Sequence, residues 1–350
     1  MPLITRRSYY PGERKIMFKI IYLEEEIANH PRVHNIISQF PDASIVNCKR
    51  YTGIFNRKSQ NFRLQKKQPA LILASKFKNF VLSAPENYGI GSNNNYYFSH
   101  MLNCIYDCRY CFLQGMYRSA HYVVFINFED FLSEIDNRIH YHEQDTVHFF
   151  SGYDCDSLAL EPVTGFTEFL LPQFRKYKNA LLELRTKSTQ IRSLLDQEPM
   201  NNVVVAYSFT PAEIAESLEY KTPTVQKRID AMIKLQNAGW KLGLRFDPLI
   251  FEENYQVKYK RLFDHVFKHI KLENLHSVSL GSFRLPKSFF HTVKKLYPDE
   301  ILFASPLEEK NGMVSYQEVF RDEMLSFCHD ILLGFVPEEK FFPCHDTNVQ

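Results

Sequence analysis

The chain has 350 residues, a net charge of only +2, seven cysteines and 45% hydrophobic residues. A chain of this length can bury a large core without disulfide bonds, and an odd number of cysteines suits a disulfide framework poorly, so a small disulfide scaffold is excluded. No apolar run reaches the length of a membrane span, and the basic first fifteen residues lack the apolar segment of a secretory signal. We therefore expect a protein of the reducing cytoplasm that does not enter a membrane.

The stretch from Ala43 to Pro85 contains no acidic residue. Its basic residues are Lys49, Arg50, Arg57, Lys58, Arg63, Lys66, Lys67, Lys76 and Lys78, and the aromatic residues among them are Tyr51, Phe55, Phe62, Phe77 and Phe80. Basic side chains can neutralise phosphates, and aromatic rings can stack on bases or wedge between them. The same composition also suits a solvated basic face above ordinary core aromatics. Both interpretations of this basic segment stay open.

Three cysteines follow in the order Cys104-x-x-x-Cys108-x-x-Cys111. Three thiolates can hold three irons of a [4Fe–4S] cluster and leave the fourth iron open. An open metal position is typical of a catalytic site, whereas a cluster that only carries electrons normally has four protein ligands. The nearest other cysteines are Cys48 and Cys155. The spacing therefore favours a catalytic iron–sulfur cluster.

Other interpretations of these cysteines stay open. A structural zinc site could be completed by His100 or His121, although zinc sites usually show two short-spaced ligand pairs, which are missing here. A redox pair of Cys108 and Cys111 would leave Cys104 without a role. Three buried thiols without any ligand are the plainest possibility.

Strand-like and helix-like segments alternate after the cysteines. The strand-like runs are residues 122–126, 146–150, 181–185, 203–205, 241–246 and 277–280, and the helix-like runs are residues 127–139, 164–178, 189–195, 223–238, 255–270 and 286–296. The clearest helix has Thr222 as its N-cap, Pro223 at its first position and Gly239 as its stop. This alternation predicts right-handed βαβ units and a parallel sheet, either open or closed into a barrel.

Polar residues follow several of the predicted strands. Ser151, Gly152, Cys155 and Asp156 follow the strand at residues 146–150, and Thr186 and Lys187 follow the strand at 181–185. Ser208 and Thr210 follow the strand at 203–205, and Asp247 follows the strand at 241–246. In a parallel sheet of this kind the functional residues gather at the carboxyl ends of the strands. Polar residues are common wherever a strand meets a loop, so this placement is consistent with a functional site at the strand ends but does not identify one.

The cysteine motif, with Tyr110 directly before its last cysteine and βα units after it, resembles the radical S-adenosylmethionine superfamily. Within it, the chain resembles the spore photoproduct lyases and their close relatives. The segments that carry this resemblance are residues 51–54, 108–114, 156–164, 186–187, 207–208, 219–243 and 283–284. The cysteine motif is specific to the superfamily, and the family resemblance depends on the other segments taken together.

The resemblance implies an α/β fold with three parts. They are a smaller N-terminal α/β subdomain over residues 1–88, a partial (β/α)6 barrel of the radical SAM type over residues 89–300, and a C-terminal helical extension over residues 301–350. The implied cofactors are a [4Fe–4S] cluster and S-adenosyl-L-methionine, which would chelate the open iron through its amino and carboxylate groups. Reductive cleavage of this cofactor would give methionine and a 5′-deoxyadenosyl radical.

The resemblance also implies roles for individual residues. Cys104, Cys108 and Cys111 would be the cluster ligands, Tyr110, Lys187 and Ser208 would contact S-adenosylmethionine, and Phe112 and Arg284 would contact the substrate. Without such roles, Tyr110 would be a packed loop aromatic, Lys187 a surface lysine and Ser208 a strand-end hydroxyl. Phe112 stands where a tyrosine is common in the lyases, which would remove one hydroxyl from the substrate pocket.

The reaction implied by the resemblance is repair of 5-thyminyl-5,6-dihydrothymine in DNA. The adenosyl radical takes a hydrogen atom from the dihydrothymine carbon, the methylene bridge breaks, and a cysteine returns hydrogen to the thymine radical. Matching residues 156–164 to the family segment puts Tyr153 at about the donor position, with Cys155 two residues later. Tyr153 can in principle donate hydrogen, Cys155 needs a small loop adjustment to do so, and an ordinary buried thiol is the alternative for Cys155.

The implied partners are lesion-containing DNA and an electron donor such as flavodoxin or ferredoxin, and the family resemblance favours a monomer. Two other functions stay open. One is the same radical chemistry on another pyrimidine lesion, an RNA base or a peptide, and the other is a non-enzymatic, metal-stabilised nucleic-acid-binding protein. Near the end of the chain, Cys328 suits a helix core, and Cys344 with His345 lacks the second short-spaced pair of a metal site.

Overall fold

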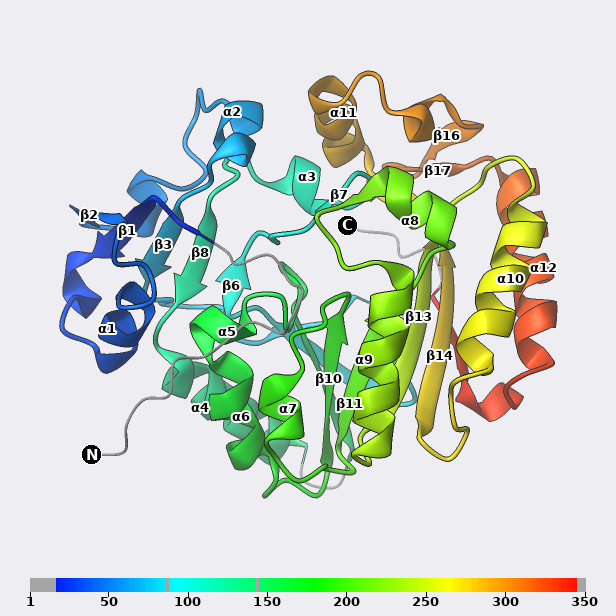
Figure 1. Cartoon of the computed structure of the whole chain (residues 1–350), viewed down its shortest axis with the longest axis horizontal. Coiled ribbons are helices and arrows are strands. Elements are labelled where there is room, and N and C mark those ends of the chain that lie inside the picture. Colours follow the sequence, from blue (N-terminus) through cyan, green and yellow to red (C-terminus); the bar gives the residue numbers. More distant parts are fainter. Residues whose placement is uncertain (1–16, 86–87, 143–144, 345–350) are drawn as a thin grey trace.

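The computed structural model describes residues 17–85, 88–142 and 145–344, which form two β-sheets and the helices around them (Figure 1). The basic start of the chain and His345 lie outside these residues. Within the described part of the chain, no helix is both long and apolar enough to cross a membrane.

The larger sheet has eight strands in the order β18-β14-β13-β11-β10-β9-β5-β4. Its bounds are β4 (Leu82–Ser83), β5 (Asn94–Phe98), β9 (Val147–Ser151), β10 (Ala180–Thr186), β11 (Val203–Ser208), β13 (Lys241–Leu249), β14 (Leu275–Ser282) and β18 (Phe341–Pro343). Every neighbouring pair from β5 to β18 is parallel, and only β4 is antiparallel. The prediction of an α/β fold with a partial parallel barrel is therefore confirmed.

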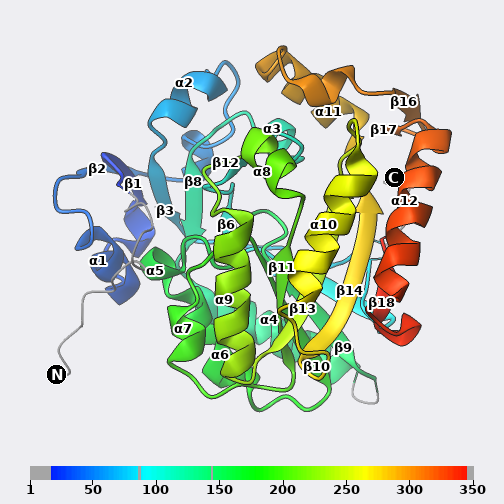
Figure 2. The same ribbon diagram turned by 45° about the vertical axis from the view of Figure 1, so that its right-hand side comes forward.

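Helices cover the outer face of this curled sheet (Figure 2). They are α4 (Phe128–Tyr141), α6 (Phe166–Phe174), α7 (Arg192–Leu195), α9 (Val225–Asn237), α10 (Tyr255–Phe267) and α12 (Glu318–Leu333). Because helices lie on one side and the barrel interior on the other, both faces of the central strands are buried. All residues of β9 and of β11 are buried accordingly.

A charged pair lies inside the barrel. The Arg245 guanidinium donates to the Glu183 carboxylate at 2.6 Å, and both side chains are fully buried. Arg245 also donates to the Ser277 hydroxyl at 2.8 Å. Burial alone would raise the pKa of Glu183, but Arg245 and Arg185 outweigh it and lower that pKa to about 2.

The two edges of the large sheet approach each other. Gly91, which precedes β5, has a positive φ of 106°, and a Cβ placed there would lie 3.4 Å from the ring of Phe342 on β18. A side chain at residue 91 would therefore be strained by its backbone and would lie in contact with the Phe342 ring.

The smaller sheet has five strands in the order β2-β1-β3-β8-β6 and is covered by α1 (Pro31–Ile37). Its bounds are β1 (Ile20–Glu24), β2 (Ser44–Cys48), β3 (Leu71–Ala74), β6 (Met101–Leu102) and β8 (Tyr122–Phe125). The predicted strand at residues 122–126 therefore exists as β8 but belongs to this sheet. The first barrel strand, β5, is absent from the predicted strands because two residues of its sequence Asn-Asn-Tyr-Tyr-Phe are asparagines, which are depleted in strands.

Both sheets extend across the predicted boundaries at residues 88 and 300. The small sheet includes β6 and β8 from beyond residue 88, and the large sheet includes β4 from before it. After residue 300 the chain forms α12 but also β16 (Leu307–Lys310), β17 (Met313–Tyr316) and β18. The division into three domains stays a prediction.

Several predicted helices differ in their bounds. The N-cap of α9 is Thr224, whose side chain accepts from the Lys227 N–H at 3.3 Å, so the prediction of Thr222 as the cap is wrong. The predicted helix at residues 164–178 is the shorter α6, which Gly165, at φ 61°, separates from the preceding α5 (Glu161–Thr164). The predicted helix at residues 189–195 is reduced to the single turn α7. Cys328 on α12 is fully buried in the core, as predicted.

Candidate active site

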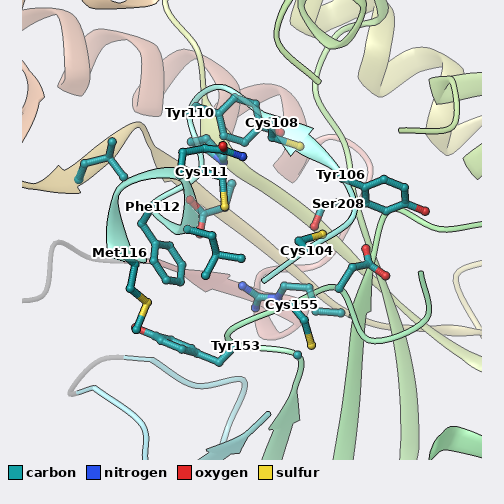
Figure 3. Close-up of a pocket in the computed structure, with 18 of the residues that line it drawn as sticks. Cys104, Tyr106, Cys108, Tyr110, Cys111, Phe112, Met116, Tyr153, Cys155 and Ser208 are labelled. Carbon is teal, nitrogen blue, oxygen red and sulfur yellow. The ribbon is translucent and has the colours of Figure 1, made fainter. Parts of the chain in front are cut away.

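A cavity of about 400 Å³ lies at the carboxyl edge of the large sheet. It lies within the size range of small-molecule and cofactor sites. The cavity is lined by every residue that the sequence predicted as a catalytic, cofactor, substrate or metal site: Cys104, Cys108, Tyr110, Cys111, Phe112, Tyr153, Cys155, Lys187, Ser208 and Arg284. Figure 3 labels all of these except Lys187 and Arg284. These residues come from loops that follow different strands, so the fold brings the whole predicted set to one place.

The cysteine loop is held by a short antiparallel pairing. Strand β7 (Asp107–Cys108) pairs with β12 (Glu219–Tyr220), which sets Cys108 opposite Glu219. The Arg109 N–H donates to the carbonyl of Leu218 at 2.8 Å. The loop therefore takes its position from the segment that follows β11.

A buried carboxylate strengthens this attachment. Glu219 accepts hydrogen bonds from the Tyr110 hydroxyl and, at 2.9 Å, from the Thr210 hydroxyl, and it forms an ion pair with Arg228. Arg228 also donates to the carbonyl of Ser208 at 3.2 Å. Burial alone would raise the pKa of Glu219, but the cations Arg228 and Lys187 lower it.

The pair of Glu219 and Arg228 thus joins the cysteine loop to the end of β11, where Ser208 lies. The sequence analysis included both residues in a family-like segment but gave neither of them a role. Their charge was visible in the sequence, whereas their complete burial was not.

The three cysteines are buried or half-buried and lie together in one part of the cavity wall (Figure 3). Burial raises the pKa of each thiol, so the thiols are protonated until a metal displaces the protons. Three soft sulfur donors without a fourth sulfur ligand in their loop suit an iron–sulfur cluster with one open iron. Cys104, Cys108 and Cys111 would hold such a cluster.

The zinc interpretation lacks its fourth ligand in this structure. His100 is fully buried and stacks on Phe166 at 4.1 Å between ring centroids, and its Nδ1 has no hydrogen-bond partner. His121 accepts from the Ala70 N–H at 3.0 Å. Neither histidine lines the cavity.

The loop after β9 fixes the end of β10. The Asp156 carboxylate accepts from the Thr186 hydroxyl and from the Lys187 N–H, each at 2.7 Å. The Lys187 ammonium lies 5.6 Å from the centroid of the Tyr110 ring. A cation and an aromatic ring thus face the cavity beside the cysteines, where a ligand with a carboxylate and a flat base could bind.

The opposite wall is aromatic. The ring of Tyr153 lies 5.5 Å from Phe112 and 4.2 Å from Tyr97, measured between centroids, and Figure 3 shows Met116 beside it. Cys155 is 8% exposed, lines the cavity and also belongs to the core of the small sheet. Tyr153 and Cys155 both border the cavity, and their roles as hydrogen donors stay predictions.

A polar group of residues lies beyond this wall. Arg284 donates to the Asp247 carboxylate at 3.1 Å and to the carbonyl of Ser282 at 2.9 Å. Burial alone would raise the pKa of Asp247, but Arg284 and Arg185 lower it. Cys344, which the sequence analysis left without a role, lines the cavity in the same place.

The basic segment is only partly the surface that its sequence suggests. The exposed members are Lys49, Arg50, Arg57, Lys58, Arg63, Lys67 and Lys78. Lys66 instead pairs with Asp107 in the cysteine loop at 2.9 Å, and Lys76 lies 4.9 Å from the ring centroid of Phe125. Phe55 and Phe62 are buried, which favours the interpretation as core aromatics for these two residues. Phe77 is 50% exposed and lies under the Arg50 guanidinium.

Comparison with known proteins shows the family to which the chain belongs. The family model described as spore photoproduct lyase matches residues 17–319. The chain is 22% identical over 288 residues to the spore photoproduct lyase of Clostridium acetobutylicum, covering 81% of this chain and 83% of that protein. It is 23% identical over 198 residues to that of Bacillus subtilis, covering 56% and 58% respectively.

Solved structures show the same fold. A spore photoproduct lyase variant with bound AdoMet and dinucleoside spore photoproduct superposes with a TM-score of 0.83 at 17% identity, covering 95% of this chain and 100% of that one. A spore photoproduct lyase complexed with dinucleoside spore photoproduct gives a TM-score of 0.81 at 17% identity, covering 94% and 98%.

Proposed function

Because the chain belongs to the spore photoproduct lyase family, we propose that it is a radical S-adenosylmethionine lyase that repairs 5-thyminyl-5,6-dihydrothymine in DNA. The observation that carries this proposal is the convergence of all ten predicted site residues on one cavity. Membership in a family of lyases also makes the chain an enzyme, which removes the interpretation as a non-enzymatic binding protein.

The cofactor end of the cavity is formed by the cysteine loop, β10 and β11. When bound, the [4Fe–4S] cluster and S-adenosylmethionine together supply a 5′-deoxyadenosyl radical, which takes a hydrogen atom from the lesion. Cys104, Cys108 and Cys111 would hold the cluster. Lys187 offers a cation for a carboxylate, Ser208 offers a hydroxyl, and Tyr110 offers a ring for the adenine.

The substrate end is formed by Phe112, Tyr153 and Arg284. The Arg284 guanidinium can donate to a thymine carbonyl, and the rings of Phe112 and Tyr153 can pack against a flat base. The wall also includes the apolar side chains of Met116 and Phe150, which would keep competing hydrogen donors from the reacting carbon. Exclusion of competing hydrogen donors matters because a primary carbon radical can abstract even an unactivated hydrogen.

A second candidate is the same chemistry on another substrate, such as a different pyrimidine lesion, an RNA base or a peptide. Two residues favour it. Tyr153 occupies the place that the family resemblance gives to the hydrogen donor, and Phe112 occupies the place of a tyrosine. Both line the cavity, so both changes alter the surface that meets the substrate.

Three further features belong to the proposal. The exposed basic residues Arg57, Lys58, Arg63 and Lys67 would bind DNA phosphates. A flavodoxin or ferredoxin would supply the electron. The chain would act as a monomer in the cytoplasm.

The test uses anaerobically purified protein with its cluster assembled. We expect about four irons per chain. Reduced protein with S-adenosylmethionine should restore thymine from an oligonucleotide that carries the spore photoproduct and should leave a cyclobutane thymine dimer unchanged. Formation of 5′-deoxyadenosine without any thymine would overturn the proposed substrate while keeping the radical chemistry. A colourless protein without iron would overturn both the proposed substrate and the radical chemistry.

A further inference from the structure

The last strand that the structure describes carries a cysteine into the active-site cavity. After α12, strand β18 pairs in parallel with β14, with Phe341 opposite Val278 and Pro343 opposite Leu280. The Cys344 N–H then donates to the carbonyl of Leu280 at 2.8 Å. Cys344 therefore stands at the carboxyl end of a parallel strand, as Lys187 and Ser208 do at the ends of theirs.

The neighbours of Cys344 belong to the substrate end of the cavity. The Asp247 carboxylate accepts hydrogen bonds both from the Cys344 thiol and from Arg284. A single carboxylate thus separates Cys344 from the arginine that the proposed function places against the lesion. Arg185 and Tyr88 line the same part of the wall.

The other cysteines outside the metal-binding motif are less well placed. Cys48 and Cys328 do not line the cavity. Cys155 does, but it lies in the core of the small sheet, close enough to Cys104 for the two thiols to influence each other electrostatically. Its place is therefore beside a predicted cluster ligand, whereas Cys344 lies beside Arg284.

Repair by radical chemistry needs a hydrogen donor at the substrate end. Once the methylene bridge has broken, one thymine is left with a carbon radical, and the adenosyl radical has already been used. A thiol is a good hydrogen-atom donor because its S–H bond is weak. Burial raises the pKa of the Cys344 thiol to about 11, with Asp247 adding to the shift, so the thiol keeps its hydrogen at neutral pH.

We propose that Cys344 is the residue that returns the hydrogen atom to the thymine radical, an inference that depends on the lyase function proposed above. The S–H bond of Cys344 breaks homolytically, a C–H bond forms at the carbon that becomes the thymine methyl group, and a thiyl radical remains on sulfur. One electron from a one-electron donor of the flavodoxin or ferredoxin class and one proton from solvent restore the thiol. Asp247 lies in position to pass that proton to the sulfur.

The experiment compares the cluster-loaded parent with Cys344→Ala and Cys344→Ser in D2O, using the dinucleoside spore photoproduct as substrate. A thiol exchanges its hydrogen with solvent, so the parent should place deuterium in the thymine methyl group. Both variants should still cleave S-adenosylmethionine to 5′-deoxyadenosine, but thymine should fall at least tenfold, lose its deuterium and be replaced by other products of the unquenched radical.

Controls separate this inference from folding and from the proposed function. Cys344→Ser keeps the size and polarity of the side chain, and its iron content should equal that of the parent. Cys48→Ala, on the edge strand β2 outside the cavity, should behave like the parent. Full thymine yield with full deuterium incorporation in Cys344→Ala would overturn the inference. If Cys155→Ala or Tyr153→Phe instead lost thymine and its deuterium, the hydrogen donor would be the residue replaced in that variant. A parent that forms no thymine at all would instead contradict the proposed function.

Discussion

The Tyr110 hydroxyl donates a hydrogen bond to the buried carboxylate of Glu219, although the two residues lie 109 positions apart in the chain. This bond joins the loop of the predicted cluster ligands to the segment after β11. Glu219 also holds Arg228, which in turn donates to the carbonyl of Ser208. One buried ion pair therefore sets where the metal-binding loop stands relative to a predicted cofactor contact.

Replacing Glu219 by Ala should destabilise the protein and release the cysteine loop. The change leaves Arg228 buried without its partner, which typically costs about 3–5 kcal/mol. We expect a lower free energy of unfolding in denaturant and fewer irons per chain after reconstitution. Glu216→Ala, an exposed change on α8 (Ala212–Leu218), is the matched control. Parental stability and iron content in the Glu219 variant would show that this pair does not hold the loop.

Lys66 and Lys67 should respond differently to the same substitution. Lys67 is exposed, so Lys67→Ala should weaken DNA binding and reduce the slope of log affinity against log salt by about 1 without changing iron content. Lys66 pairs with Asp107, so Lys66→Ala should lower cluster occupancy. Salt titrations of DNA binding and iron analysis of both variants test these two expectations. Equal effects of the two substitutions on both readouts would contradict them.

Phe112→Tyr should increase repair if the substrate is the spore photoproduct. The new hydroxyl would stand on the cavity wall near Tyr153, where it can hydrogen-bond to a base, and such a bond is worth about 0.5–1.5 kcal/mol. We expect roughly 2- to 10-fold more thymine per 5′-deoxyadenosine formed. Phe169→Tyr, an aromatic change outside the cavity, is the control. A lower ratio in the Phe112 variant would favour a different substrate.

Acid should destabilise the barrel through Glu183. The folded pKa of Glu183 is about 2, below its ordinary value of 4.5, so its ion pair stabilises the fold above pH 4.5 and is lost as the pH falls from 4.5 towards 2. The loss amounts to ~3 kcal/mol. Denaturant unfolding measured across this range checks the slope. Glu183→Gln should be less stable at pH 7, because Arg245 loses its partner, but should lack this part of the acid dependence. If Glu183→Gln lost stability between pH 4.5 and 2 as steeply as the parent, groups other than Glu183 would cause the acid dependence.

The sequence predicted the alternation of strands and helices and the residues that follow each strand. These features are local, because hydrophobic periodicity and capping signals report the conformation of neighbouring residues. Where the local signal was weak, the prediction was wrong. The Asn-rich β5 was missed, and Thr222 was taken for a cap that Thr224 provides.

The sequence by itself determined the chemistry that the chain can offer: three thiols at cluster spacing, with a lysine and a serine at later strand ends. Only the tertiary structure decided which distant residues meet. It buried Glu219 against Arg228, removed Lys66 from the basic surface to pair with Asp107, and returned the last strand to the sheet so that Cys344 faces Asp247. Such pairs depend on strand order and on burial, which arise from contacts between segments far apart in the chain and leave no periodic signal in either segment.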